Sequence, residues 1–200
     1  MTIIAKATES NFKKLALPEA GTTQAVCCGV WDIGLQESTF NNETKVQHKV
    51  VIAWEIDQLI DDPESEYHGK PYMLSNKYTL SLDDRSNLHR DLVAWRGKPY
   101  SDEDIKKGVD LEILYGINCL LNIIHKETPT GTYANIASIM PPIKGSEKLV
   151  PLRTKDEPAP KWVLNLAENA VQPVPTGADA DAYDVAGYPD GDGMPDFMKD

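Results

Sequence analysis

The sequence has no long apolar run, few cysteines and few basic residues, and each shortage makes one class of protein less expected. No stretch approaches the roughly 18 consecutive apolar residues of a membrane-spanning helix, so we expect no membrane span. The first residues lack a basic region followed by a long apolar run, so no secretory signal is expected. The cysteines are an odd set that includes a vicinal pair: Cys27, Cys28 and Cys119. Such a set favours reduced, buried thiols and a cytoplasmic location over a disulfide framework.

Catalytic and metal-binding patterns are also missing. A zinc site needs a fourth ligand and paired spacings such as C-x-x-C, and the sequence has neither. The four histidines are scattered and form no H-E-x-x-H pattern. The glycine patterns of phosphate loops, dinucleotide-binding turns and nucleophile elbows do not occur. We therefore expect no enzyme activity, no metal and no cofactor.

Positive charge is scarce. The chain has 20 Lys and Arg against 31 Asp and Glu, a formal net charge of −11. Residues 177–200 hold seven of the acids and one base, while the other 176 residues hold 24 acids and 19 bases. The body of the chain is thus still mildly acidic, which argues against a nucleic-acid partner. Any DNA-binding groove must therefore be a local basic patch.

The sequence does contain the alternation that is typical of half-buried strands. The clearest case is 45–56, where Val50 and Trp54 belong to an apolar side and Lys45 and Lys49 belong to the opposite side. Further strands are expected at 22–35, 72–82, 119–126 and 133–140. Turn signals separate them at 41–42 and 129–131. These segments predict a mainly β protein.

Between the third and fourth expected strands the period becomes helical. Ser86 is a plausible N-cap, Leu88, Leu92 and Trp95 recur at helical spacing, and Gly97 is a plausible end. A second helix start is expected at 101–104, which resembles a capping box.

The order of expected elements is strand, strand, strand, helical insert, strand, strand. That order predicts a five-stranded barrel of the oligonucleotide/oligosaccharide-binding type, the OB-fold, in which a helix lies between the third and fourth strands. We expect an N-terminal arm at 1–20 and the OB-like domain at 21–146. A proline-rich linker with a short docking helix is expected at 147–176, and a disordered acidic tail at 177–200.

Several runs of residues resemble a family of phage and prophage proteins. The runs are Lys77-Tyr78-Thr79-Leu80-Ser81-Leu82, Ser86-x-Leu88-x-x-Asp91-Leu92-x-x-Trp95-Arg96-Gly97, Cys119-Leu120-Leu121-Asn122-Ile123-Ile124-His125, Tyr133-Ala134-Asn135-Ile136 and Pro141-Pro142-Ile143-Lys144-Gly145. The resemblance covers about residues 22–146. Proteins of this family look like single-stranded DNA-binding proteins used in phage replication and recombination. The resemblance implies that function for this chain, in the cytoplasm of a bacterial host, with self-association left open.

The C-terminus is similar to the acidic tails of bacterial and phage single-strand-binding proteins, which close on a Pro-Phe tip. The residues that carry this similarity are Asp190, Asp192, Pro195, Asp196 and Phe197. The chain departs from the pattern because Asp196 separates Pro195 from Phe197 and three residues follow Phe197. The similarity implies docking to a phage recombinase or host replication protein. Alternatively, the tail competes with DNA for the groove, or only keeps the protein soluble.

Binding single strands without sequence preference needs cations for phosphates and aromatic faces for bases. The candidates are the lysines on polar sides of the strands, three aromatic residues, and a basic cluster after the third strand: Lys45, Lys49, Lys77, Trp31, Tyr72, Tyr78, Arg85, Arg90, Arg96 and Lys98. Trp54 and Trp95 share sides with apolar residues and are predicted to be core. Trp31 and Tyr78 fit either role. The strand lysines could instead be solvated, and the arginines could pair with neighbouring aspartates.

The sequence therefore predicts a protein that coats and protects single-stranded DNA. A non-catalytic module that binds a phage or host protein is the main alternative, and the acidic body would suit it. A nuclease or nucleotide-processing enzyme is the second alternative, against which the missing catalytic patterns argue.

Overall fold

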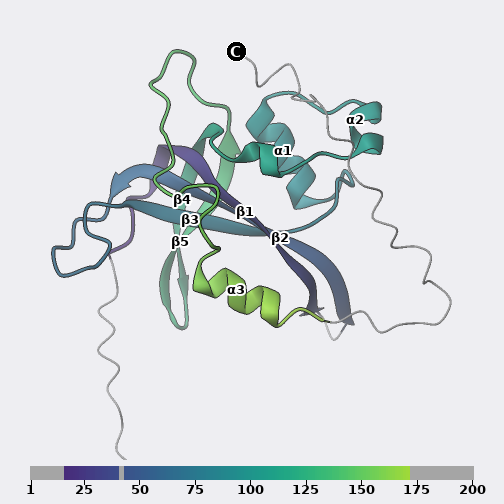
Figure 1. Cartoon of the computed structure of the whole chain (residues 1–200), viewed down its shortest axis with the longest axis horizontal. Coiled ribbons are helices and arrows are strands. Elements are labelled where there is room, and N and C mark those ends of the chain that lie inside the picture. Colours follow the sequence, from purple (N-terminus) through teal and green to yellow (C-terminus); the bar gives the residue numbers. More distant parts are fainter. Residues whose placement is uncertain (1–15, 41–42, 172–200) are drawn as a thin grey trace, which may run out of the picture.

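The computed structural model describes residues 16–40 and 43–171 and shows a mainly β protein (Figure 1). The strands are β1 (Gly21–Phe40), β2 (Glu43–Leu59), β3 (Pro71–Thr79), β4 (Asn118–Thr128) and β5 (Gly131–Met140). The helices are α1 (Asn87–Arg96), α2 (Asp102–Lys107) and α3 (Lys161–Glu168), with a 3-10 turn, η1 (Glu112–Leu114), before β4. The predicted order of strands and helical insert is present.

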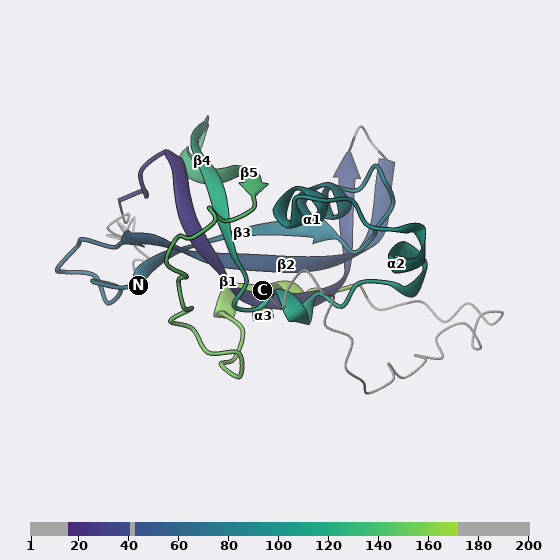
Figure 2. The same cartoon turned by 90° about the horizontal axis from the view of Figure 1, so that it is seen from above.

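All five strands belong to one antiparallel sheet in the order β3-β2-β1-β4-β5. β1 is 20 residues long, and it pairs with β4 near its start and with β2 along most of its length. Irregularities between Cys27 and Gly29 and between Asp32 and Leu35 interrupt its register with β2, which allows so long a strand to bend. Figure 2 shows the resulting twist: β4 and β5 stand at a steep angle to β2 and β3.

The inner face of the sheet carries the main core. The alternating residues Val50, Ile52, Trp54 and Ile56 of β2 are buried there, as the alternation predicted. The buried side of α1 packs against them, and the ring centroids of Trp54 and Trp95 lie 5.6 Å apart. The predicted core role of both tryptophans is confirmed.

The sheet is not closed into the predicted barrel. No hydrogen-bonded ladder joins β3 to β5 among the described residues, so both remain edge strands. α1 contacts both of these strands where they approach each other. The buried side chains Leu88, Leu92 and Trp95 occupy that space, which explains why the edges do not come within the roughly 4.8 Å of paired strands.

The outer face of the sheet is covered in part by residues 147–160, called the strap below, and by α3. Two buried polar side chains hold the strap. Asn118 accepts the N–H of Leu149 (2.7 Å) and donates to its carbonyl (2.9 Å). Glu55 accepts the N–H groups of Leu152 (2.5 Å) and Arg153 (3.1 Å). This stretch was expected to be a linker, but these bonds fix it to the sheet.

α3 is the short docking helix expected in this region. Its Val163 is buried against Ile33 and Val51, with Leu166 and Ala167 partly buried beside it. Figure 1 shows α3 and α1 on opposite sides of the sheet. α3 therefore forms a second, smaller core on the outer face.

Other expectations concern the thiols and the loops. The three cysteines are buried and unpaired, as expected. The capping box at Ser101 is present, with Asp104 as its acidic member. No helix within the described ranges is long and apolar enough to span a membrane. Of the expected arm only 16–20 is described, and the tail at 177–200 lies outside the described residues.

Candidate nucleic-acid interface

The three predicted lysines of β2 and β3 share the outer face. Alternation places Lys45 and Lys49 on the side of β2 opposite the core, and the pairing of Val51 with Lys77 places Lys77 on the same side of β3. Lys49 pairs with Thr79, so Lys49 and Lys77 are diagonal neighbours, roughly 7–8 Å apart at the backbone. The structure thus brings these predicted residues together.

The contacts of Lys49 are with neutral groups. Its Nζ donates to Oε1 of Gln47 (2.8 Å) and to Oγ1 of Thr79 (2.7 Å). Partial burial, followed by the positive charge of Lys77, holds the pKa of Lys49 below its usual value. An anion bound between the two ammonium groups would be stabilised because it offsets their mutual repulsion.

Carboxylates are nearly absent from this part of the outer face. The outward positions of 45–55 on β2 and 73–79 on β3 hold three lysines and one acid, Glu55. Glu55 is buried and its two oxygens accept the strap N–H groups described above. In a chain of net charge −11 this is a local basic strip, called the lysine strip below and consisting of Lys45, Lys49 and Lys77.

Trp31 lies on the same face and pairs with Val51, which in turn pairs with Lys77, so its backbone is close to the lysine strip. Its ring is half-buried and packs over Gly29, and the guanidinium of Arg153 lies 5.4 Å from the ring centroid. It also contacts the small outer core under α3. Strap and helix therefore already cover much of the ring.

The two predicted tyrosines belong to the inner face. Tyr78 is 4% exposed, donates to Oδ2 of Asp91 (2.9 Å) and accepts from Nδ2 of Asn76 (3.1 Å). Burial, followed by the charge of Asp91, raises the pKa of Tyr78. Tyr72 is half-buried against the main core. Neither ring lies beside the lysine strip, and the buried ring of Tyr78 offers no open face to a base.

The predicted cluster of arginines and Lys98 lies around α1, on the opposite side of the sheet. Arg85 is paired with Asp83 (Nε–Oδ1, 3.4 Å) and Arg90 with Asp91 (3.3 Å), which is the alternative that their spacing left open. Arg96 has a side chain only 12% exposed, lies 4.6 Å above the Tyr100 ring and donates to the carbonyl of Pro99 (3.2 Å). Lys98 is exposed in the loop after α1. This cluster does not join the lysine strip.

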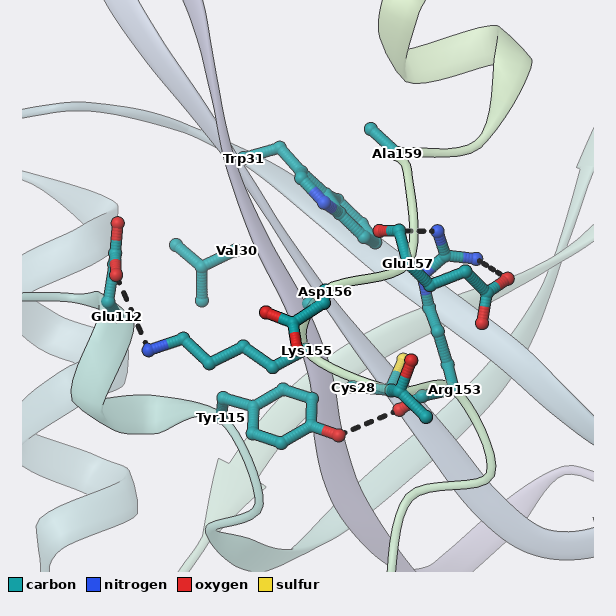
Figure 3. Close-up of a pocket in the computed structure, with 12 residues that line it drawn as sticks. Cys28, Val30, Trp31, Glu112, Tyr115, Arg153, Lys155, Asp156, Glu157 and Ala159 are labelled. Atoms are coloured by element: carbon teal, nitrogen blue, oxygen red, sulfur yellow. Dashed lines mark hydrogen bonds and ion pairs between the residues drawn. The ribbon is translucent and has the colours of Figure 1, made fainter.

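A cavity of about 270 Å³ lies between β1, η1 and the strap (Figure 3). Its two cations are paired with acids: Arg153 Nη1 lies 2.9 Å from Glu157 Oε1, and Lys155 Nζ lies 3.4 Å from Glu112 Oε2. Tyr115 donates to the carbonyl of Arg153 (2.8 Å), as Figure 3 also shows. These contacts hold the strap against the sheet, and they make the cavity a weaker anion site than the lysine strip.

Sequence reasoning missed the residues that depend on long-range packing. Glu55 and Asn118 each sit in a strand with no local sign of a strap partner 31–98 residues away. Trp162 belongs to the docking helix expected within 147–176, and nothing in the local sequence indicates what its ring contacts. The predicted tail residues Asp190, Asp192, Pro195, Asp196 and Phe197 lie outside the described residues.

No group of three or more His, Cys, Asp or Glu side chains placed to hold a metal ion occurs in the described parts of the chain. No protein-family model matches the sequence, and no curated protein matches it.

Proposed function

We propose that this protein binds single-stranded DNA, without strong sequence preference, along the outer face of β2 and β3. The observation that carries the proposal is the lysine strip: three cations on one face, with Glu55, the acid at the outward positions of 45–55 and 73–79, buried and hydrogen-bonded. A phosphate between Lys49 and Lys77 would relieve the repulsion between them, and Thr79 and Gln47 supply neutral hydrogen-bonding groups beside it.

The order β3-β2-β1-β4-β5, with α1 between β3 and β4, supports an OB-like assignment. In that fold the second and third strands form the usual binding face, and these strands carry the lysine strip here. The biological role that fits is coating exposed strands during phage replication or recombination, in the bacterial cytoplasm, before handing them to a recombinase or polymerase. The acidic tail would recruit such a partner.

The proposal predicts modest, strongly salt-dependent affinity. A single strand releases about 0.7 counterions for each phosphate that is neutralised, so three lysines give a slope of log affinity against log salt near −2. Stacking of bases must supply the rest of the affinity, at about 1–3 kcal/mol for each base.

The test compares two charge-matched double variants by fluorescence anisotropy with a labelled thymine oligonucleotide. Lys49→Gln with Lys77→Gln removes two charges from the lysine strip. Lys106→Gln with Lys107→Gln removes two charges from the exposed end of α2. The first pair should weaken binding and make the salt slope shallower by about 1.4, while the second pair should leave the slope nearly unchanged.

Equal losses of DNA affinity in the two double variants would show that only net charge matters, and would exclude the lysine strip as the binding surface. Absence of any binding by the unaltered protein would overturn the proposed function and favour a module that binds another protein.

A further inference from the structure

α3 exposes two large apolar side chains although it is docked on the sheet. Trp162 is 40% exposed and Leu164 is 43% exposed, on either side of the buried Val163. Successive residues of an α-helix are rotated by about 100°. Because Val163 faces the sheet, Trp162 and Leu164 project toward opposite flanks of the helix.

The direction of α3 decides which flank faces the lysine strip. Ala159, just before the helix, lines the same cavity as Trp31 (Figure 3), and Gln36 Nε2 donates to the carbonyl of Leu166 (2.9 Å). The N–H of Val171 donates to the carbonyl of Leu35 (2.7 Å). α3 therefore runs in the same direction as β1 along the outer face.

The hydrogen bonds of β2 fix the position of β3 relative to this helix. The side chain of His48 points to the inner face, and its backbone carbonyl accepts the N–H of Leu80, just after β3 (2.8 Å). Because backbone groups alternate between the two neighbouring strands, the inward-facing residues of β2 bond to β3 and the outward-facing residues bond to β1. For L-amino acids and a right-handed helix parallel to β1, this arrangement puts β2 and β3 on the Trp162 flank. Leu164 projects toward the β4 flank.

The buried neighbour of Trp162 connects it to the lysine strip. Val163 packs on Val51, and Val51 pairs directly with Lys77 across β2 and β3. The indole of Trp162 therefore projects from α3 toward the side of the sheet where Lys49 and Lys77 lie on the outer face. In Figure 1 α3 lies beside β1, and Val163 reaches Val51 of the neighbouring β2.

We propose that Trp162 is the base-stacking residue beside the lysine strip: a base of the bound strand packs on the indole while its phosphate lies between Lys49 and Lys77. The inference rests on the proposed function and adds the aromatic surface that the lysine strip lacks. An exposed indole can stack on a base, and the two neighbouring lysines can bind its phosphate. Stacking tolerates any sequence because every base has a flat face. A helix that holds the outer core then also forms part of the binding surface.

The experiment uses the full chain and a labelled thymine oligonucleotide, with Leu164→Ala as the matched control on the opposite flank. Trp162→Ala should weaken binding at least fivefold, the lower end for one stacked base, without changing the salt slope. Trp162→Phe should recover most of that loss because a ring remains. Leu164→Ala should bind like the unaltered protein.

Intrinsic fluorescence gives a second readout. Trp54 and Trp95 are 0% and 5% exposed, and Trp31 is half-buried, so quenching on addition of DNA should come mainly from Trp162 and largely vanish in Trp162→Phe.

Three results would overturn the stacking role: unchanged affinity in Trp162→Ala, an equal loss in Leu164→Ala, or quenching that persists in Trp162→Phe. If Trp162→Ala binds normally while the Lys49 and Lys77 double variant does not, stacking fails and the proposed function stands. If the unaltered protein binds no oligonucleotide, both fail.

Discussion

Replacing Glu55 by Gln should destabilise the protein by about 3 kcal/mol. The buried carboxylate accepts two backbone N–H groups of the strap, from Leu152 and Arg153. Glutamine keeps the shape but offers one acceptor, so one N–H loses its partner and the other bond becomes neutral. A hydrogen bond to a charged group contributes about 1.5–3 kcal/mol, and weakening the second bond adds about 1 kcal/mol.

The matched control is Glu112→Gln. Glu112 also contacts the strap, through Lys155 at 3.4 Å, but its side chain is 73% exposed. An exposed ion pair contributes about 0–1 kcal/mol, so this variant should unfold nearly like the unaltered protein. Urea denaturation measures both values, and hydrogen exchange should show faster exchange of the strap and α3 amides in Glu55→Gln. Equal costs for the two variants, or a cost below about 1 kcal/mol for Glu55→Gln, would show that Glu55 does not hold the strap.

Three further predictions concern the core. Tyr78→Phe removes the hydrogen bond to Asp91, so the free energy of unfolding measured with urea should fall by about 1–2 kcal/mol while DNA affinity stays unchanged. Weaker DNA binding at unchanged stability would instead place the ring in the interface. Gly29→Ala puts a methyl group into the Trp31 ring and should cost about 1–3 kcal/mol, and a stable variant with unaltered tryptophan emission would contradict that contact. Burial raises the pKa of Cys27 to about 12 and also raises the pKa of Cys28 and Cys119. Native protein at pH 8 should therefore resist a disulfide reagent that labels all three thiols after unfolding. Rapid labelling of native protein would contradict their burial.

The strands, the helical insert and the core tryptophans could be predicted because they depend on local alternation and spacing. The period of two along 45–56 correctly separated Trp54 from Lys45 and Lys49. Closure of the sheet could not be predicted, because whether β3 and β5 pair depends on how much space α1 occupies between them.

The candidate site was predicted in part for the same reason. Strand alternation placed Lys49 and Lys77 on polar sides, and the structure places them as neighbours. Alternation also put Tyr78 opposite Lys77, which fitted either a core or a surface ring until the inner face was known. The position of Trp162 depends on contacts between α3 and strands more than 100 residues earlier, for which the sequence contains no local signal.

Preference for single-stranded over duplex DNA tests the proposed function most directly. Anisotropy should be measured for a labelled strand of about 20 nucleotides and for the same strand in a duplex, each at roughly 50 and 200 mM salt. We expect clear binding of the single strand at low salt, weaker binding at high salt and much weaker binding of the duplex, whose bases cannot stack on a side chain. Equal binding of both forms, or binding of neither, would contradict the proposed function.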